Sequence, residues 1–302
     1  MTQPHLNYKS FAKINLSLRI LGKRPDGYHE IDTILQTISL HDDITFTHRT
    51  DQQIVLTCDD PTIPTDQTNL IIKAAASIQQ RRPKGVDISL TKRIPAQGGL
   101  GGASANAAIT VIGLNTLWNL ELQNNEIEEL LKPLGSDVPF FLSGGTARAQ
   151  GTGTLISSLP DAPKLYLIVI TPNAKVSTPV AYASLNAPSL TTQESLSILS
   201  SSFAEPSFED FNQTALHNDF EGVIFEIEPE IRRAKEALLD SGAQGGLLAG
   251  SGSSVFGLFE NADARERALV NLKCERGWRV FSCETISRDT YSRSLISSGS
   301  RY

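Results

Sequence analysis

Cysteine is scarce in this sequence. Cys58, Cys274 and Cys283 stand far apart, their number is odd and no CxxC pair occurs among the 302 residues. This spacing implies neither a disulfide framework nor a zinc site. The five histidines contain no HxxxH pair, so no metal-ligand constellation appears. We therefore expect buried free thiols in a reducing compartment and no metal bound by the protein alone.

Excess positive charge is also missing. Lysine and arginine number 27 against 33 aspartates and glutamates, which gives a net charge of −6. A general nucleic-acid binder needs clustered positive charge, so no nucleic-acid partner is expected. Residues 11–21 are interrupted by Lys13, Asn15 and Arg19, so they form neither a signal-peptide core nor a membrane span. We expect a cytoplasmic protein without a membrane partner, and the sequence leaves the oligomeric state open.

Several catalytic motifs are absent. The chain has no GxxxxGK[ST] sequence, and a GxGxxG pattern fails because Ser104 occupies the place of its last glycine. It has no GxSxG sequence, which disfavours a serine hydrolase, and neither HRD nor DFG, which disfavours a protein kinase.

Alternating apolar residues predict strands in the first half of the chain. Residues 11–21 alternate, with Lys13 and Asn15 on the polar face; the period alone favours a solvated face there. The order is strand-rich first and then strands mixed with helices, which indicates an α+β architecture in two lobes, 1–154 and 155–302. The remaining predicted strands are 34–40, 44–48, 54–58, 86–94, 164–172 and 278–286, and the helices are 70–78, 107–120, 124–135, 178–185, 191–203, 229–242 and 262–272.

Glycine is concentrated in one place. Gly98, Gly99, Gly101 and Gly102 follow a predicted strand and precede a predicted helix. Glycine lets backbone amides approach a ligand, and a helix start adds unpaired N–H groups and partial positive charge. The alternative is a flexible turn, but a turn would need only one of the four glycines. The pattern favours a phosphate site, to which Ser104 can add a hydroxyl.

Four blocks together resemble one family. They are AKINLSLRILGKRPDGYHEI, IPAQGGLGGASANAA, LGSDVPFFLSGGTARAQGTG and LLAGSGSSVFGLF, and in this order they span most of the chain. The chain is thereby similar to the GHMP small-molecule kinase superfamily. AKINL followed closely by PDGYHEI narrows the resemblance to the 4-diphosphocytidyl-2-C-methyl-D-erythritol kinases. Coverage is weakest near residues 187–212 and in the last dozen residues.

The resemblance implies a fold and a reaction. An N-terminal lobe like a ribosomal-protein β-α-β module would pack on a C-terminal α/β sandwich, with the active site between them. ATP would phosphorylate the 2-hydroxyl of the cytidyl-linked methylerythritol, in the non-mevalonate route to isoprenoid precursors. The substrates would thus be small molecules. Mg²⁺ is expected with ATP, held mainly by phosphates, with Ser104 as a candidate protein ligand.

Lys13 and Asp137 match the family's catalytic pair. Asp137 would accept the hydroxyl proton or orient the hydroxyl, and Lys13 would pair with it and offset charge on the phosphoryl group. Taken alone, an aspartate in a Ser-Asp-Val-Pro turn is more simply a capping or loop carboxylate, and the resemblance reverses that preference.

The resemblance also implies the ATP contacts. Asn69 and Asn115 match positions that approach adenine, although a helix-start asparagine and a helix-face amide are their simpler readings. The usual family residues are replaced at Gln97, Ala103, Ala105 and Ser253. The loop predicted to hold the ATP phosphates comprises Pro95, Ala96, Gln97, Gly98, Gly99, Leu100, Gly101, Gly102, Ala103, Ser104 and Ala105.

The cytidyl substrate would meet both halves of the chain. Asn15 lies on the same strand face as Lys13, and Tyr28 and His29 match the cytidine-binding segment. Tyr182 matches an aromatic residue that would stack on the other face of cytosine. The alternative for Tyr182 is packing within its own lobe. Thr178, Gly250 and Ser251 complete the predicted substrate site, with a plain tight turn as the alternative at Gly250.

Three rival functions remain open from the sequence. A superfamily kinase acting on homoserine, mevalonate or a sugar would not need PDGYHEI. A non-catalytic nucleotide sensor would be expected to lack the Lys13–Asp137 pair. RNA binding by a ribosomal-like lobe is opposed by the acidic charge balance.

Overall fold

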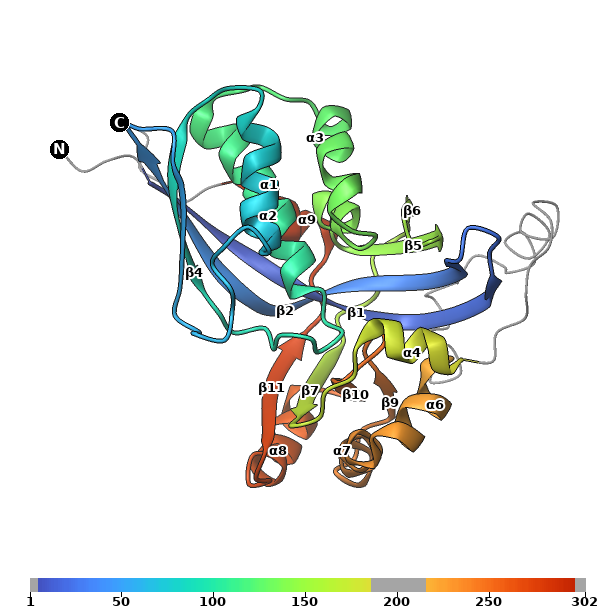
Figure 1. The fold of residues 1–302 in the computed structure, drawn as a ribbon. Coiled ribbons are helices and arrows are strands. Elements are labelled where there is room, and N and C mark those ends of the chain that lie inside the picture. Colours follow the sequence, from blue (N-terminus) through green and yellow to red (C-terminus); the bar gives the residue numbers. More distant parts are fainter. Residues whose placement is uncertain (1–4, 186–215, 297–302) are drawn as a thin grey trace.

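The computed structural model describes residues 5–185 and 216–296, which form two lobes stacked along the long axis of the molecule (Figure 1). The first lobe is built from β1 (His5–Lys23), β2 (His29–Arg49), β3 (Ile54–Cys58), α1 (Leu70–Gln79), β4 (Gly85–Thr91), α2 (Gly102–Trp118), α3 (Asn124–Leu131), the 3₁₀ helices η1 (Lys132–Leu134) and η2 (Val138–Leu142), β5 (Thr146–Gly151) and β6 (Leu155–Ser158). The rest comprises β7 (Tyr166–Pro172), α4 (Thr178–Ser184), β8 (His217–Asn218), α6 (Phe220–Ile227), α7 (Pro229–Asp240), β9 (Gly245–Leu248), β10 (Val255–Phe259), α8 (Ala262–Leu272), β11 (Trp278–Glu284) and α9 (Arg288–Ser294).

A seven-stranded sheet organises the first lobe. Its order is β3-β4-β2-β1-β8, and β5 joins through β2 and carries β6. The parallel strands β3 and β4 are connected by α1, which gives the β-α-β unit that the resemblance implies. The strands predicted at 34–40 and 44–48 are one strand, β2, because its antiparallel pairing with β1 continues from Lys23↔His29 to His5↔Thr47.

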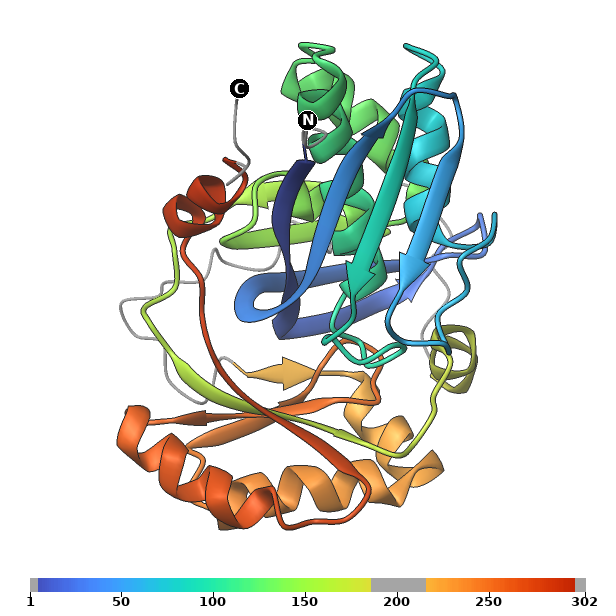
Figure 2. The same ribbon diagram turned by 90° about the vertical axis from the view of Figure 1, so that its left-hand side faces the viewer.

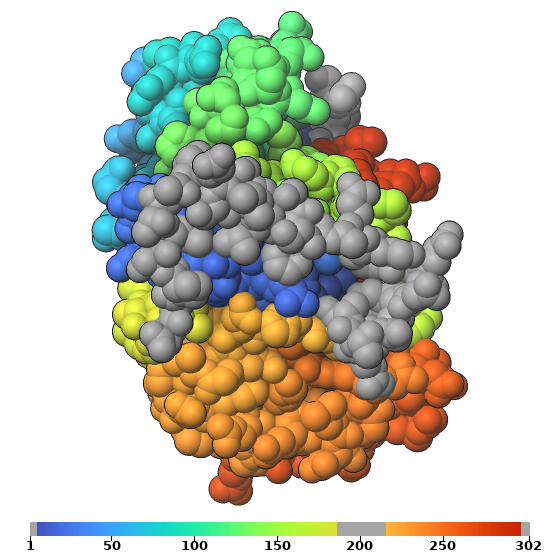
Figure 3. Space-filling model, turned by 90° about the vertical axis from the view of Figure 1, so that its right-hand side faces the viewer, coloured from blue at the N-terminus to red at the C-terminus, as the bar shows by residue number. Residues whose placement is uncertain are grey.

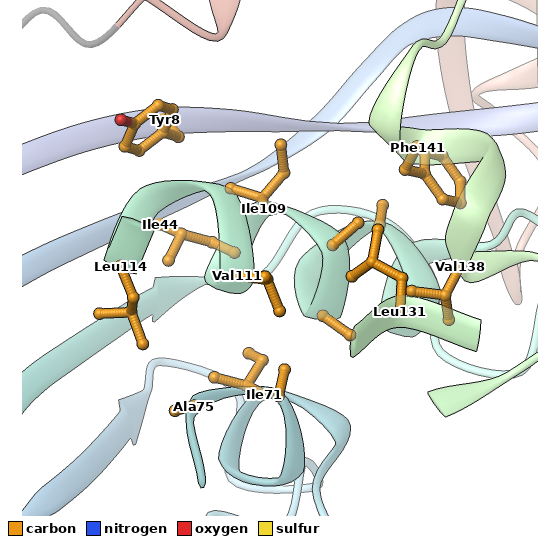
Figure 4. Close-up of a cluster of buried hydrophobic side chains, with 14 of the residues drawn as sticks. Tyr8, Ile44, Ile71, Ala75, Ile109, Val111, Leu114, Leu131, Val138 and Phe141 are labelled. Atoms are coloured by element: carbon orange, nitrogen blue, oxygen red, sulfur yellow. The ribbon is translucent and has the colours of Figure 1, made fainter. Parts of the chain in front are cut away.

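Helix α2 lies in the centre of this lobe (Figure 4). Ile109 and Leu114 pack with Tyr8 and Ile44 of the sheet, and Ile71 of α1 belongs to the same core. The first two turns of the helix, residues 102–108, carry only small side chains and Asn106, and residues 105–108 are buried. A Cβ at Gly113 would lie 2.5 Å from the ring of Phe46, so glycine is required for this close packing. The predicted buried helix at 107–120 is thus confirmed, with its start earlier at Gly102.

The second lobe is an antiparallel sheet covered by helices. Its strand order is β11-β7-β10-β9, and α7 and α8 lie on the face away from the first lobe (Figure 2). The apolar run predicted as a strand at 164–172 is the central strand β7, whose residues 167–171 are all buried. Helix α7 buries Ile231, Ala234 and Leu238, at the spacing that predicts an amphipathic helix.

The predicted range of the second lobe, 155–302, is wrong at its start and at its end. Strand β6 (Leu155–Ser158) pairs with β5 in the first sheet, so the cut at 154/155 falls inside a hairpin. Helix α9 returns to the first lobe (Figure 2). There the Tyr291 hydroxyl donates to the Phe141 carbonyl at 2.5 Å. Helix α9 lies here because it buries an aromatic side chain, although the strand that precedes it in sequence belongs to the second lobe. The helix predicted at 191–203 lies outside the described residues.

The three cysteines are unpaired. Cys283 is buried, and desolvation raises the pKa of its thiol to about 12. Cys274 is exposed, so the expectation of buried thiols is wrong there. Across residues 5–185 and 216–296, no helix has the length and apolar character needed to cross a membrane.

Candidate active site

Lys13 and Asp137 meet between the two lobes. Lys13 lies on β1, and its backbone N–H donates to the Leu100 carbonyl of the glycine loop at 3.0 Å. Its Nζ lies 3.3 Å from Asp137 Oδ2, and the two side chains are 5% and 37% exposed. The polar face of β1 is therefore buried here, contrary to what strand period alone favours. The buried ammonium is oriented, while the carboxylate keeps access to a cavity.

Asn15 fixes the lysine from the same strand. Lys13 Nζ donates to Asn15 Oδ1 at 2.8 Å, and Asn15 Nδ2 donates to Thr33 Oγ1 at 2.8 Å. The Thr33 hydroxyl in turn donates to the Ser17 carbonyl at 2.6 Å. This chain sets the Asn15 amide with its oxygen toward the ammonium, so two of the three lysine N–H groups have defined acceptors.

Asp137 is presented by a short turn. It directly precedes η2, whose Val138, Pro139 and Phe140 are buried and anchor the segment. Its carboxylate makes no capping hydrogen bond to η2. The alternative of a helix-capping aspartate is therefore not what this side chain does in the structure.

The glycine loop surrounds a cavity of about 330 Å³ between β4 and α2. Gly101, with φ +70°, precedes the first turn of α2, and a Cβ there would lie 2.9 Å from both the Lys13 stem and the Phe141 ring. Ala105 is fully buried in the core and does not line this cavity. The predicted loop residues that line it are Pro95, Ala96, Gln97, Gly98, Gly99, Leu100, Gly101, Gly102, Ala103 and Ser104.

The two predicted adenine contacts have different positions. Asn69 lines the cavity of the glycine loop and caps α1, because its Oδ1 accepts from the Ile71 N–H at 2.9 Å. Asn115 lies thirteen residues after the start of α2, roughly 20 Å along the helix. Its amide bonds both the N–H and the carbonyl of Leu122. The structure therefore does not bring Asn115 to the glycine loop, and closing the turn after α2 accounts for its side chain.

A turn of the second lobe, residues 249–254, closes onto the glycine loop. The N–H groups of Ser253 and Ser254 donate to the carbonyls of Gln97 and Gly98 at 3.4 and 3.2 Å. A Cβ on Gly99 would lie 1.9 Å from the Ala249 carbonyl oxygen. Some of the glycine in this loop thus serves contact between the lobes, a role that the phosphate interpretation did not include.

The Lys13–Asp137 pair lies in a central cavity of about 350 Å³. Gly99, Gly101 and Ser104 line both this cavity and that of the glycine loop. Ser136 and Tyr182 line both the central cavity and a third, outer one. The three cavities therefore follow one another as one cleft. The first lobe alone lines it at the glycine loop, and both lobes line the other two cavities. Asn15, Thr178, Gly250 and Ser251 of the predicted substrate site line the central one.

The outer cavity, of about 1040 Å³, has aromatic walls. Tyr182 stacks on His29 with ring centroids 4.8 Å apart and meets Phe220 edge-on at 4.9 Å. Burial, with a contribution from Asp137, raises the pKa of Tyr182 to about 12. Tyr182 therefore packs within its own lobe, as the alternative interpretation expects, and it also lines the cleft. Its stacking on cytosine stays a prediction. Tyr28 is 66% exposed at the rim, so the structure stacks His29, and not Tyr28, on Tyr182.

Sequence reasoning missed a support beneath the glycine loop. Asp42 of β2 is fully buried, and its carboxylate accepts from Lys92 Nζ and Asn106 Nδ2, each at 2.9 Å. The same carboxylate accepts the backbone N–H groups of Arg93 and Ile94 at 2.7 Å. The segment that leads into the loop is therefore held from below. The signal in the sequence was a pair of adjacent aspartates, Asp42 and Asp43, between the predicted strands 34–40 and 44–48.

Comparisons with known proteins agree with this geometry. The model of the GHMP kinases N terminal domain matches residues 69–145, and that of the GHMP kinases C terminal matches residues 199–277. A 4-diphosphocytidyl-2-C-methyl-D-erythritol kinase of Syntrophus aciditrophicus is 39% identical, covering 93% of this chain and 99% of its own. One of Gloeobacter violaceus is 36% identical, with coverages of 92% and 93%.

Solved structures extend the comparison. The crystal structure of a 4-(cytidine 5'-diphospho)-2C-methyl-D-erythritol kinase matches with a TM-score of 0.75 at 31% identity, over 92% of this chain and 98% of that one. A homoserine kinase of Cytophaga hutchinsonii, at 20% identity, 95% and 96% coverage and a TM-score of 0.70, shares the fold. The two-lobed GHMP-kinase fold predicted from the sequence is confirmed. The chain belongs to the GHMP kinases and, among these small-molecule kinases, to the family of the 4-diphosphocytidyl-2-C-methyl-D-erythritol kinases.

Proposed function

We propose that this protein transfers the γ-phosphoryl group of ATP to the 2-hydroxyl of 4-diphosphocytidyl-2-C-methyl-D-erythritol. The observation that carries the proposal is the Lys13–Asp137 pair in the central cavity, between a backbone-lined cavity and an aromatic one. A phosphate donor and an acceptor that carries a nucleobase can then occupy opposite ends of one cleft.

The glycine loop would hold the triphosphate. The first backbone N–H groups of α2 have no partner within the helix, and the helix dipole places partial positive charge there. Both features favour phosphate, and Ser104 adds a hydroxyl in the same place. Because Gly101 separates this helix start from Lys13, the terminal phosphate would point toward the ammonium.

The chemistry would take place at the pair. The acceptor hydroxyl oxygen forms the new bond to the γ-phosphorus, the bond from that phosphorus to the departing ADP oxygen breaks, and the hydroxyl proton goes to Asp137. Lys13 holds the carboxylate and offsets negative charge that develops on the transferring group. Asn15 orients the ammonium for both tasks.

The acceptor would be recognised at the outer cavity. Tyr28 at the rim offers a free ring face to cytosine, and the stacked His29 and Tyr182 form the inner wall. Base stacking on aromatic side chains contributes about 1–3 kcal/mol per base. Thr178 and Ser251, whose hydroxyl oxygens are 3.0 Å apart, lie between this wall and the catalytic pair and would contact the sugar-derived part.

Mg²⁺ fits this site as an ion that arrives with ATP. Among the residues that the structure describes, no group of three or more His, Cys, Asp or Glu side chains could hold a metal. The Ser104 hydroxyl and the Asp137 carboxylate are among the oxygen atoms that line the central cavity, which suits an ion that keeps water and binds phosphates. When bound, Mg²⁺ would neutralise phosphate charge. The three unpaired thiols favour a reducing compartment, and we propose the cytoplasm.

An acceptor panel tests the proposed function. ADP release is measured with the cytidyl substrate, homoserine, mevalonate and a hexose, with the phosphorylated product identified by mass. The cytidyl substrate should give a kcat/KM at least about a hundredfold above the others, as expected where a site binds a group that competitors lack. Preference for homoserine or mevalonate would contradict the proposal. ATP binding without turnover of any acceptor would indicate a nucleotide sensor.

A further inference from the structure

Asn218 lies where the two lobes join. It belongs to β8, which runs parallel to β1 and pairs with it at Leu18. The side chain is 5% exposed, and its Oδ1 accepts from the Phe220 N–H at 2.9 Å. Its Nδ2 donates to the carbonyls of Leu248 and Gly250, both at 2.8 Å. The backbone of β8 thus pairs with the strand that carries Lys13, and the Asn218 side chain holds the start of the 249–254 turn.

The 249–254 turn also lies against Lys13 and the glycine loop. Gly250, with φ +56°, approaches so closely that a Cβ would lie 3.4 Å from Lys13 Nζ and 3.1 Å from the Gly99 carbonyl oxygen. Ser254 donates its N–H to the Gly98 carbonyl at 3.2 Å. A displacement of this turn would therefore move the glycine loop relative to the ammonium.

We propose that Asn218 is a positioning residue for phosphoryl transfer, acting through the 249–254 turn on Lys13 and the glycine loop. The inference rests on the proposed function of the cleft, and it assigns no contact with either substrate to Asn218. An amide is the chemistry required, because both partners of Nδ2 are carbonyls and only accept hydrogen bonds. A carboxylate of the same size would face them without a donor. A misplacement of about 1 Å at a distance from the reacting atoms can cost on the order of 10²-fold in rate.

The test compares Asn218→Asp with the wild type in steady-state kinetics with both substrates. The expected result is a fall in kcat on the order of 10²-fold. The KM of the acceptor should change by less than roughly threefold, because an interaction made mainly in the transition state lowers kcat and leaves KM. Asn218→Ser, which shortens the side chain without burying a charge, should lower kcat in the same direction and provides a second variant if the first does not fold.

A matched control is available at Gln36. This residue is 1% exposed, and its Nε2 donates to the Thr37 and Ile286 carbonyls at 2.8 and 3.1 Å. It lines none of the three cavities of the cleft. Gln36→Glu reproduces the loss of an amide that donates to two carbonyls, so it should lower stability while kcat stays near that of the wild type.

A double-mutant cycle with Gly250→Ala separates positioning from general destabilisation. If Asn218 acts through Gly250, the two changes act on one contact, and the double variant should be little slower than the slower single variant. Multiplicative losses, or a folded Asn218→Asp protein with wild-type kcat, would overturn the inference. The ratio of variant to wild type is measured on whichever acceptor the wild type phosphorylates. Failure of the proposed substrate is therefore seen in the wild type alone, separately from failure of this inference.

Discussion

The two ends of the cleft are built from different parts of the chain. At the glycine loop the walls are largely backbone. Asp42 accepts hydrogen bonds from the segment that leads into the loop, and the 249–254 turn of the second lobe donates hydrogen bonds to the loop. At the outer cavity the walls are side chains, with Tyr182 and His29 stacked and Tyr28 exposed at the rim. Figure 3 shows the N-terminal strands of the first lobe lying against the second lobe on one face of the molecule. At the glycine loop, an added side-chain atom should clash with backbone and disrupt the site. At the outer cavity, removal of one side chain should weaken substrate binding by a limited amount.

The largest effect on kcat is expected at the Lys13–Asp137 pair, between the two ends of the cleft. Asp137→Asn keeps the size of the side chain but removes the proposed proton acceptor, so kcat should fall about 10²- to 10⁴-fold. ATP affinity, measured by equilibrium titration, should stay within a few-fold because the glycine loop is untouched. A variant that retains wild-type turnover would remove Asp137 from the mechanism.

The rigidity of the loop end is tested by a pair of glycines. Gly99 and Gly27 both have positive φ, +74° and +87°, but an added Cβ meets the Ala249 carbonyl at 1.9 Å in the first and nothing within 4 Å in the second. Gly27→Ala carries only the conformational strain of about 1–2 kcal/mol. Gly99→Ala adds overpacking of about 1–3 kcal/mol and should also raise the KM for ATP.

Urea unfolding and ATP kinetics of the two glycine variants measure this difference. Equal losses of stability, with an unchanged KM for ATP in Gly99→Ala, would contradict the view that the loop end is fixed by backbone contact between the lobes.

The outer cavity should respond more mildly. Tyr182→Ala removes the inner aromatic wall, and a loss of about 1–3 kcal/mol of stacking corresponds to roughly a 5- to 150-fold rise in the KM of the cytidyl substrate. Tyr182→Phe keeps the ring and serves as the control. The KM for ATP should stay constant in both, and a comparable rise there would show that the ends are not independent.

The smallest effect is a pH dependence at His29. Burial, and to a lesser extent the charge of Lys23, lowers the pKa of His29 below 6.5, so the imidazole is neutral at pH 7. Below pH 6.5 the unfolded chain takes up this proton before the folded one does, so stability falls as the pH decreases through this window. His29→Gln should flatten that part of the stability profile, measured by thermal unfolding between pH 5 and pH 8. An unchanged slope would argue against a partly buried, neutral imidazole.

The sequence predicted the glycine-loop end of the candidate site more completely than the outer end. The glycine run and the strand before it indicated a phosphate site from local chemistry, and all its predicted loop residues except Ala105 line the cavity. The stacking partner of Tyr182 was predicted less well, because 153 residues separate it from His29 and neither sequence segment carries information about the other. Asn115 was assigned to ATP from its motif position, although its side chain closes a local turn.

What the sequence determined by itself was local: the strand and helix periods, the glycine run between a strand and a helix, and the blocks that relate the chain to its family. These depend on backbone sterics and on neighbours within a few residues. Only the tertiary structure decided that Lys13 is buried, that α9 belongs to the first lobe and that Asn218 joins the lobes. Such features depend on which distant segments exclude water from one another, and this is a property of packing that no single segment carries.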